Sequence, residues 1–259
     1  MASHDCVFIG GKQIGVNCLR FLCKSGIKPG LVIGNTDDTG EDTWHESLVK
    51  EARKQKFTCV QGKNVKDSEV IQKIKAAKPE IIFCIGGTQL IPKEVLAIPR
   101  IGCLNIHPAL LPKYRGRFST VHAIFNGEKE TGVTAHWMDD RIDAGPIIFQ
   151  AKIPIADDDT AKTLYDKFTH EGGALFRDVV KLWLEGSEIK SIPQNEAEAT
   201  YCKKELPNKG VIDWDWDGIR IRKFILAMTF EPFPPADFAI GKKKMVIIDE
   251  KYFGGFGKK

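Results

Sequence analysis

A hydrogen-bond donor and a side chain able to exchange a proton near pH 7 stand together in the segment IGCLNIHPALLPKYRGR. Asn105 and His107 lie two positions apart at the end of the apolar run IGCLNIH, which predicts a buried strand. Residues two apart in a strand point to the same face. Pro108 ends the strand, so the carboxamide and the imidazole are presented together at its carboxyl end, where open α/β sheets bind ligands.

A carboxylate follows in the segment DDRIDAG, which separates the apolar segments GVTAHWM and GPIIFQ. Asp143 can fold back from there to orient the imidazole, fixing its tautomer and stabilising its cation. The Asn105 amide is a neutral donor for a developing oxyanion. Because no Ser or Cys nucleophile with its own sharp turn stands in these segments, the trio favours direct acyl transfer to an amine. The structural alternative is a strand cap, a buried histidine and an Asx turn.

The two segments closely resemble the 10-formyltetrahydrofolate-dependent formyltransferases. That family pairs N-x-H-P-[SA]-L-L-P, here residues 105–112, with a later G-V-T-x-H-x-M-x-x-x-x-D-x-G, here residues 132–145. The resemblance implies that Asn105, His107 and Asp143 move a formyl group from the folate to an amine through a tetrahedral intermediate. His136 competes with His107 as the base, but it matches a structural histidine of the second motif.

The resemblance also indicates a branch of the family. The loop KYRGR after the first motif is similar to that of enzymes formylating nucleotide-linked sugars or initiator tRNA, whereas purine-pathway enzymes tend to have a Lys-Gly-Ser type of loop. The later segments ATYCKKELPNKGVIDWDW and KFILAMTFEPFPPADF resemble the sugar enzymes. Because the tRNA enzyme continues into a C-terminal barrel and this sequence stops at Lys259, the sugar branch is favoured.

Binding residues follow from the resemblance alone. In the family the pterin inserts between the loop after the fourth strand and the loop before the catalytic Asp, which implies folate contacts by Ile85, Gly86, Gly87, Leu90, Ile91, Asp139 and Asp140. The candidate contacts of a nucleotide-linked sugar are Gly11, Lys12, Lys113, Tyr114, Arg115, Arg117, Tyr201 and Phe230. For the two arginines the alternative is an ion pair beside a helix, and for the aromatic residues it is the core or a dimer interface.

The elements that position these residues alternate between strand and helix through the first 180 residues, which predicts an α/β fold with a mostly parallel sheet. Strands are expected at 6–10, 31–34, 57–61, 80–86 and 101–107, and helices at 14–26, 43–54 and 160–185. The resemblance implies a Rossmann-like formyltransferase core over residues 1–190. A short C-terminal extension of a helix and a β-hairpin over 191–259 is the expected homodimer interface.

The early phrase IGGKQIG does not match the dinucleotide-binding pattern G-x-G-x-x-G, because Lys12 stands where the second glycine belongs. We therefore expect Gly10, Gly11 and Gly15 to form a tight strand-to-helix turn, and no NAD to bind. The seven cysteines show no C-x-x-C spacing, so neither a zinc site nor a disulfide framework is expected.

Composition limits the partners. A chain of 259 residues with 42% hydrophobic residues can bury a sizeable core, and no signal-type or membrane-length apolar run is present. The net charge of +4, whose excess lies after residue 200, is small for a surface that docks tRNA. These features predict a cytoplasmic protein without a nucleic-acid, membrane or metal partner.

The sequence therefore predicts an N-formyltransferase with 10-formyltetrahydrofolate as donor co-substrate. The expected acceptor is the primary amine of a dTDP-, UDP- or GDP-linked aminodeoxysugar. Three alternatives remain open: a methionyl-tRNA formyltransferase, a formyltetrahydrofolate hydrolase whose acceptor is water, and a catalytically silent folate-binding protein. The last is disfavoured because all three candidate catalytic residues are present.

Overall fold

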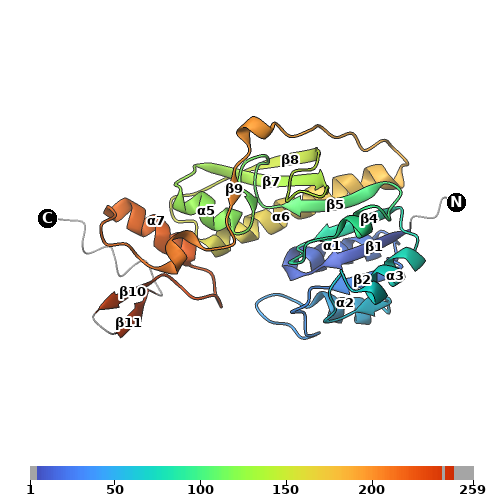
Figure 1. Ribbon diagram of the computed structural model, residues 1–259, viewed down its shortest axis with the longest axis horizontal. Helices are drawn as coiled ribbons and strands as arrows, with labels where there is room; N and C mark the ends of the chain where they lie inside the picture. Colours follow the sequence, from blue (N-terminus) through green and yellow to red (C-terminus); the bar gives the residue numbers. More distant parts are fainter. Residues whose placement is uncertain (1–4, 241–242, 248–259) are drawn as a thin grey trace. The chain divides into compact units, whose positions relative to one another are not determined.

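The computed structural model describes residues 5–240 and 243–247 of the chain (Figure 1). The chain divides into two compact units, each assembled from separate stretches of sequence. The first comprises Met1–His107, Thr134–Gln150 and Thr169–Gln194, and the second comprises Pro108–Val133, Ala151–Phe168 and Asn195–Lys259. The domain boundary expected at residue 190 stays a prediction.

A seven-stranded sheet carries the α/β fold, with the strand order β3-β2-β1-β4-β5-β7-β8. Neighbours from β3 to β5 are parallel, whereas β7 runs antiparallel to β5. The mostly parallel sheet expected from the sequence is therefore confirmed. The strands are β1 (Cys6–Gly10), β2 (Leu31–Gly34), β3 (Cys59–Val60), β4 (Ile81–Ile85), β5 (Gly102–His107), β7 (Glu130–Trp137) and β8 (Ile147–Pro154).

Both faces of β1 are buried, by alternate residues of the strand. Val7 and Ile9 belong to a core cluster that includes residues of two helices, α3 (Ser68–Ala76) and α4 (Lys93–Leu96). Phe8 points the other way and packs against Phe83 and Phe176, with ring centroids 6.4 Å apart in each pair. This alternation is the strand period, and burial on both faces is typical of parallel sheets. The helices of the first unit are α1 (Lys12–Lys24), α2 (Leu48–Lys54), α3 (Ser68–Ala76), α4 (Lys93–Leu96) and the later part of α6 (Ala161–Leu184).

The helix expected at 43–54 is shorter than its sequence pattern indicated, because α2 begins at Leu48. The Asp38 carboxylate accepts hydrogen bonds from the Ser47 hydroxyl and the Val49 amide. Ser47 in turn caps α2 by accepting from the Lys50 amide at 3.0 Å. These bonds hold residues 35–47 as an ordered loop after β2.

The turn from β1 into α1 is as tight as its glycines predicted. Gly10 has φ +144°, and a Cβ atom there would lie 1.9 Å from the Ile85 carbonyl oxygen at the end of β4. The Gly11 amide donates to that same oxygen at 3.1 Å. Only glycine allows two backbones to approach so closely. Gly10 and Gly11 therefore allow the backbones of β1 and β4 to pack directly against each other at the carboxyl edge of the sheet.

The second unit contains two packed helices, α5 (Ser119–Phe125) and α7 (Gly218–Met228). Phe125 and Phe224 pack with ring centroids 5.6 Å apart. The Arg220 guanidinium lies 5.1 Å from the centre of the Phe125 ring and 5.0 Å from that of Trp216. These contacts attach the C-terminal helix to the segment that follows the first sequence motif.

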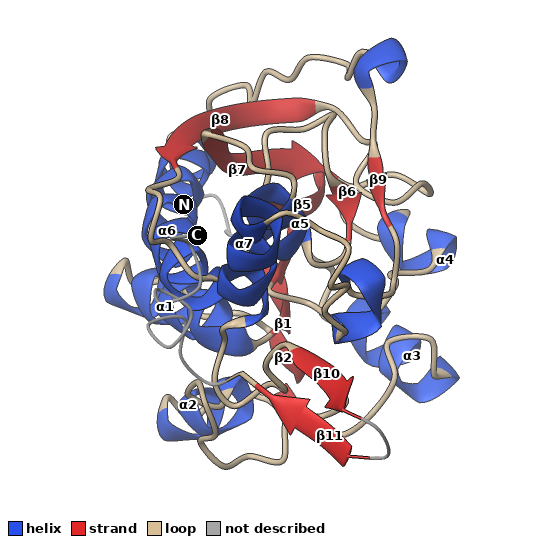
Figure 2. Ribbon diagram, turned by 90° about the vertical axis from the view of Figure 1, so that its left-hand side faces the viewer, coloured by secondary structure: helices blue, strands red, loops and turns tan. Residues whose placement is uncertain are grey.

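Two pairs of short strands complete the second unit. The parallel pair β6 (Arg115–Gly116) and β9 (Tyr201–Cys202) lies side by side in Figure 2. The antiparallel pair β10 (Asp237–Ile240) and β11 (Lys243–Val246) corresponds to the expected hairpin, although residues 241–242 lie outside the described residues. Its expected part in a homodimer stays a prediction. No helix within the described ranges is long and apolar enough to cross a membrane.

The packing of β1 against β4 generates a stability prediction. Replacing Gly10 by alanine should lower the free energy of unfolding by about 3 kcal/mol or more, since the new Cβ overlaps the Ile85 carbonyl. Gly26→Ala is the matched control, because Gly26 also has a positive φ (+79°) but no atom within 4 Å of its Cβ position. The control should lose only about 1 kcal/mol from backbone strain. Urea unfolding compares the two, and equal losses would contradict the packing argument.

Candidate active site

The antiparallel pairing of β7 with β5 assembles the polar cluster at the end of β5. Asn105 is directly opposite His136, and His107 is opposite Thr134. His107 and His136 are 4% and 1% exposed, respectively. The strand period turns Asn105 and His107 to one face, as the sequence predicted.

Asp143 reaches this cluster from the loop between β7 and β8. Its oxygen Oδ2 lies 3.4 Å from His107 Nδ1, and its oxygen Oδ1 accepts from Asn105 Nδ2 at 3.4 Å. One carboxylate therefore faces both partners, and the structure brings together the three residues expected at the catalytic centre.

The loop is built to hold Asp143 in an unusual backbone conformation. Asp143 has φ +50°, a region that aspartate tolerates better than most residues. The Gln194 side-chain amide donates to the carbonyls of Asp143 (2.8 Å) and Gly145 (2.7 Å). A Cβ on Gly145 would lie 1.9 Å from the Trp137 carbonyl oxygen, so the loop closes tightly over the end of β7. Local strain of this kind is typical of functional loops.

His136 fixes the orientation of the Asn105 carboxamide. His136 Nδ1 lies 2.8 Å from the Trp137 carbonyl oxygen and must donate to it, so His136 Nε2 accepts from Asn105 Nδ2 at 3.1 Å. A flipped Asn105 amide would point its oxygen at the Nε2 lone pair and at the Asp143 carboxylate. Both Asn105 amide hydrogens thus have protein acceptors. To donate to an oxyanion, Asn105 must break one of these hydrogen bonds, and the longer one, to Asp143, is the weaker of the two.

Burial lowers the pKa of His136 from 6.5 to about 4, against the opposing attraction of the Asp143 carboxylate. His136 is therefore neutral near pH 7 and serves as an acceptor for Asn105. This arrangement fits the structural role that we expected for His136. Both histidines face the Asp143 carboxylate, but His107 Nδ1 lies closer to it (3.4 Å) than His136 Nε2 does (3.7 Å).

The two loops expected to hold folate both lie in the first unit. The loop after β4 has Gly86 in a left-handed conformation (φ +64°), and Gly87 has open space around its Cβ position. Ile91 from this loop and Met138 from the start of the Asp143 loop pack against the same core cluster. The ion pair between Lys93 and Asp140, at 2.6 Å, joins the start of α4, which follows the first loop, to the second loop. The folate contacts of both loops stay predictions.

The residues expected to bind the sugar nucleotide are divided between the two units. Gly11 and Lys12 lie at the start of α1, where the Gly11 amide donates to the Ile85 carbonyl at the end of β4. The other six, Lys113, Tyr114, Arg115, Arg117, Tyr201 and Phe230, belong to the second unit. Phe230 is half-buried and packs against Tyr165 and the exposed Phe233, with centroids 5.4 and 5.2 Å apart. Contact with substrate stays a prediction for all eight.

Arg115 has a structural partner. Its side chain is fully buried, and its two terminal nitrogens donate to both Glu196 carboxylate oxygens at 3.0 and 2.9 Å. Its guanidinium also bonds to the Tyr201 hydroxyl at 2.7 Å. Glu196 begins a short 3₁₀ helix (η1, Glu196–Glu198), so the ion pair beside a helix, the alternative considered for Arg115, is present.

Two residues of the site were missed from the sequence. Gln194 stands in an irregular polar stretch without any signal. Asn35 directly follows β2, and the rule that pointed to Asn105 at the end of β5 could have identified it. Its side chain bonds to the loop after β4 at Gly86 and Thr88.

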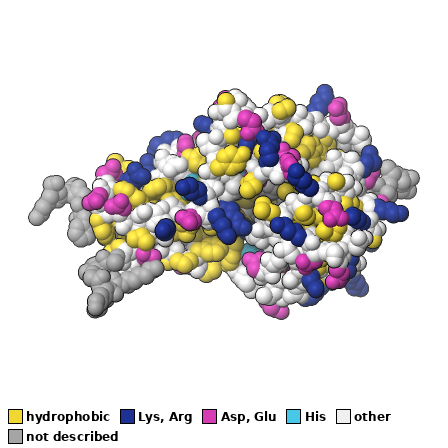
Figure 3. Space-filling view, in the orientation of Figure 1, with side chains coloured by type: hydrophobic (Ala, Val, Ile, Leu, Met, Phe, Trp, Pro, Cys, Tyr) yellow, Lys and Arg dark blue, Asp and Glu magenta, His cyan; other side chains and the backbone are white. Residues whose placement is uncertain are grey.

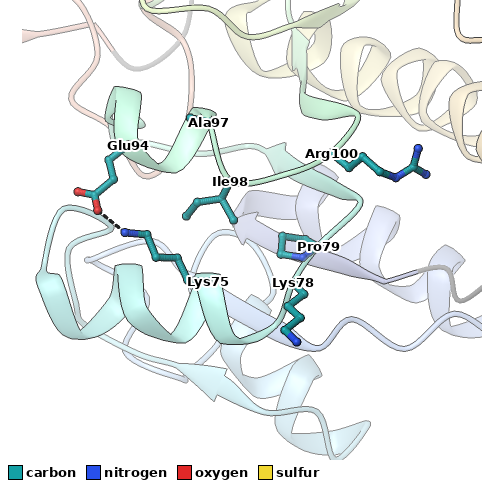
Figure 4. Close-up of a pocket in the computed structure, with 7 residues that line it drawn as sticks. All are labelled: Lys75, Lys78, Pro79, Glu94, Ala97, Ile98 and Arg100. Carbon is teal, nitrogen blue, oxygen red and sulfur yellow. Dashed lines mark hydrogen bonds and ion pairs between the residues drawn. The ribbon is translucent and has the colours of Figure 1, made fainter.

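A hollow of about 610 Å³ lies elsewhere in the first unit. Figure 4 draws the side chains that line it. It is lined by Lys75, Lys78, Pro79, Glu94, Ala97, Ile98 and Arg100. Pro79 and Arg100 precede β4 and β5, so this hollow is at the amino ends of these strands. The polar cluster is at the carboxyl end of β5, and the hollow is therefore not the active site.

The low pKa of His136 generates a prediction for stability against pH. The unfolded chain takes up a proton on this residue below about pH 6.5, whereas the folded chain does so only near pH 4. The free energy of unfolding should therefore fall by about 2 kcal/mol through this group between pH 7.5 and pH 5. His136→Gln should remove that part of the slope in urea unfolding. His170→Gln, at an exposed position of α6, should retain it, and identical slopes in both variants would refute the assignment.

Comparison with known proteins places this geometry in a family. The formyl transferase family model matches residues 12–180. The methionyl-tRNA formyltransferase of Alkaliphilus oremlandii is 33% identical over 233 residues, covering 89% of this chain and 74% of that enzyme. The N-formyltransferase of Helicobacter canadensis, solved with folinic acid and dTDP-3-aminofucose, is 27% identical with a TM-score of 0.78, covering 95% of this chain and 87% of that one. WlaRD, a sugar 3N-formyltransferase solved with dTDP and 5-N-formyl-THF, is 27% identical with a TM-score of 0.76, covering 95% and 86%. The chain belongs to the formyl transferase family.

Proposed function

We propose that this formyltransferase moves the formyl group of 10-formyltetrahydrofolate to the primary amine of a nucleotide-linked aminodeoxysugar. The observation that carries the proposal is the likeness, over 95% of the chain, to an N-formyltransferase solved with folinic acid and dTDP-3-aminofucose. The donor fits the two neighbouring loops of the first unit. Their backbone groups suit the donor and acceptor pattern along a pterin edge.

The chemistry follows from the cluster at the end of β5. The neutral amine attacks the formyl carbon, the carbonyl oxygen becomes an oxyanion, and the bond from that carbon to the folate nitrogen then breaks. The Asn105 amide gives up its 3.4 Å hydrogen bond to Asp143 and donates to the oxyanion instead. The oxyanion is the stronger acceptor of the two, because it is more basic than a carboxylate. His107, with Nδ1 facing Asp143, takes the amine proton and returns it to the leaving nitrogen.

Charge around the first unit's site supports a small acceptor over a nucleic acid. The loop 35–47 leaves the carboxyl edge of the sheet with five acidic residues and no lysine or arginine. Asp139 and Asp140 precede Asp143 in the other loop, with Arg141 as the one basic residue between them. On the face drawn in Figure 3, basic and acidic side chains are interspersed. Four of these carboxylates are ion-paired: Glu46 with Arg20, Asp42 with Lys50, Asp139 with Arg141 and Asp140 with Lys93. The two loops therefore lack the large basic surface that a tRNA needs, whereas a diphosphate needs only one or two cations.

Methionyl-tRNA formyltransfer is the second candidate, because the A. oremlandii enzyme is 33% identical to this chain. The two candidates share the donor and the catalytic cluster. They differ in the acceptor, and a tRNA acceptor predicts binding that weakens steeply with salt.

The acceptor is decided by incubating the protein with 10-formyltetrahydrofolate and nucleotide-linked 3-amino and 4-amino deoxysugars, with initiator methionyl-tRNA in a parallel reaction. Mass spectrometry should show a gain of one formyl group on a sugar nucleotide and none on the tRNA. Formylation of the tRNA alone would overturn the sugar assignment. Loss of the formyl group to water without a formylated acceptor would indicate the hydrolase.

Substitutions in the cluster test the chemistry. His107→Ala and Asp143→Ala should each lower kcat by roughly 100- to 10,000-fold, because proton transfer loses its carrier or the carrier loses its orienting carboxylate. His170→Ala, on the exposed side of α6, is the control and should keep the parent rate. Circular dichroism verifies that all three proteins are folded. Near-parent rates in both cluster variants would refute the mechanism.

A further inference from the structure

A buried side chain outside the catalytic cluster contacts the loop that we assign to folate. Asn35 is 4% exposed and follows the last residue of β2. Its Nδ2 donates to the Gly86 carbonyl at 3.1 Å, and its Oδ1 accepts from the Thr88 amide at 3.0 Å. One carboxamide thus engages the loop at two points, more than 50 residues away in the sequence.

Asn35 is itself held firmly from the other side. Its own amide donates to the Gly10 carbonyl at 2.9 Å, and its carbonyl accepts from the Asp38 amide at 3.0 Å. Asp38 is 9% exposed and accepts further bonds from Ser47 and Val49, at the start of α2. The backbone of Asn35 is therefore held by hydrogen bonds to β1 and within the loop after β2. A fixed backbone lets the Asn35 side chain hold the residues that it contacts in one position.

The loop after β4 has little room to take another path near Asn35. A Cβ on Gly11 would lie 2.7 Å from Asn35 Nδ2, and one on Gly86 would lie 2.2 Å from the Gly11 carbonyl oxygen. Beyond this contact, Gly87 has open space around it and Leu90 is 63% exposed. The loop thus changes from tightly packed at residues 85–86 to more exposed at Gly87 and Leu90, and Asn35 bonds on both sides of Gly87. A second anchor lies further along, where the Gln89 side-chain oxygen accepts from the Val65 amide at 2.8 Å.

From this geometry we propose that Asn35 is a positioning residue for the formyl donor. By fixing the Gly86 carbonyl and the Thr88 amide, it sets the backbone pattern of residues 86–91 that meets the pterin edge. Asn35 reaches the donor only through the loop and takes no part in proton transfer. The inference rests on the proposed function, since it assumes that this loop binds folate.

The test is the affinity for folinic acid, measured by fluorescence titration, alongside kcat at saturating donor and acceptor. Asn35→Ala removes both bonds and should weaken folinic acid binding about tenfold to hundredfold. Asn35→Asp keeps the acceptor for Thr88 but sets an oxygen against the Gly86 carbonyl, and should weaken it about tenfold. In both variants kcat should stay within about threefold of the parent, and KM for the acceptor should not change.

The control is Asn17→Asp, the same chemical change at an exposed position of α1. Hydrogen exchange supplies a readout that does not depend on activity: in Asn35→Ala the amides of residues 86–91 should exchange faster. Parent affinity for folinic acid in folded Asn35→Ala and Asn35→Asp would overturn the inference and leave the proposed function standing. Absence of folinic acid binding by the parent protein would overturn both.

Discussion

The antiparallel pairing of β7 with β5 is the constraint on which the site depends. Its register sets His136 opposite Asn105, and the chain that leaves β7 then brings Asp143 back to both Asn105 and His107. A shift of one residue would turn every side chain of β7 to the other face. The sheet also buries His136, and burial keeps it neutral as an acceptor for Asn105. Geometry and electrostatics at the site thus have one origin.

The parallel strands contribute a second, independent requirement, which is close contact at their carboxyl edge. The backbones of Gly10 and Gly11 touch the end of β4, and Asn35 bonds to the loop beyond it. Glycine is needed at these positions because the backbones of β1 and β4 approach each other too closely for a side chain. This requirement explains why the segment is rich in glycine although it lacks the dinucleotide-binding spacing. The polar cluster at the end of β5 and the loop after β4 are therefore set by different strand pairs.

Local pattern was sufficient for much of the fold and for the core of the site. The strand period of IGCLNIH places Asn105 and His107 on one face, and the alternation of strands with helices indicates a parallel sheet. Both are short-range properties, fixed by backbone geometry within a few residues. Asp143 came from its place in a second motif, and the structure shows the same carboxylate facing His107.

Tertiary structure decided what depends on contacts between distant segments. Arg115 had two interpretations in the sequence, and only the fold shows its bidentate ion pair with Glu196, 81 residues away. The residues before α2 have a helical pattern. They form a loop instead, because the Asp38 carboxylate accepts hydrogen bonds from the Ser47 hydroxyl and the Val49 amide. Sequence by itself determined the type of chemistry and the strand that presents it. Hydrogen bonds across the fold determined which side chains hold that chemistry in place, because their partners are neighbours in space and not along the chain.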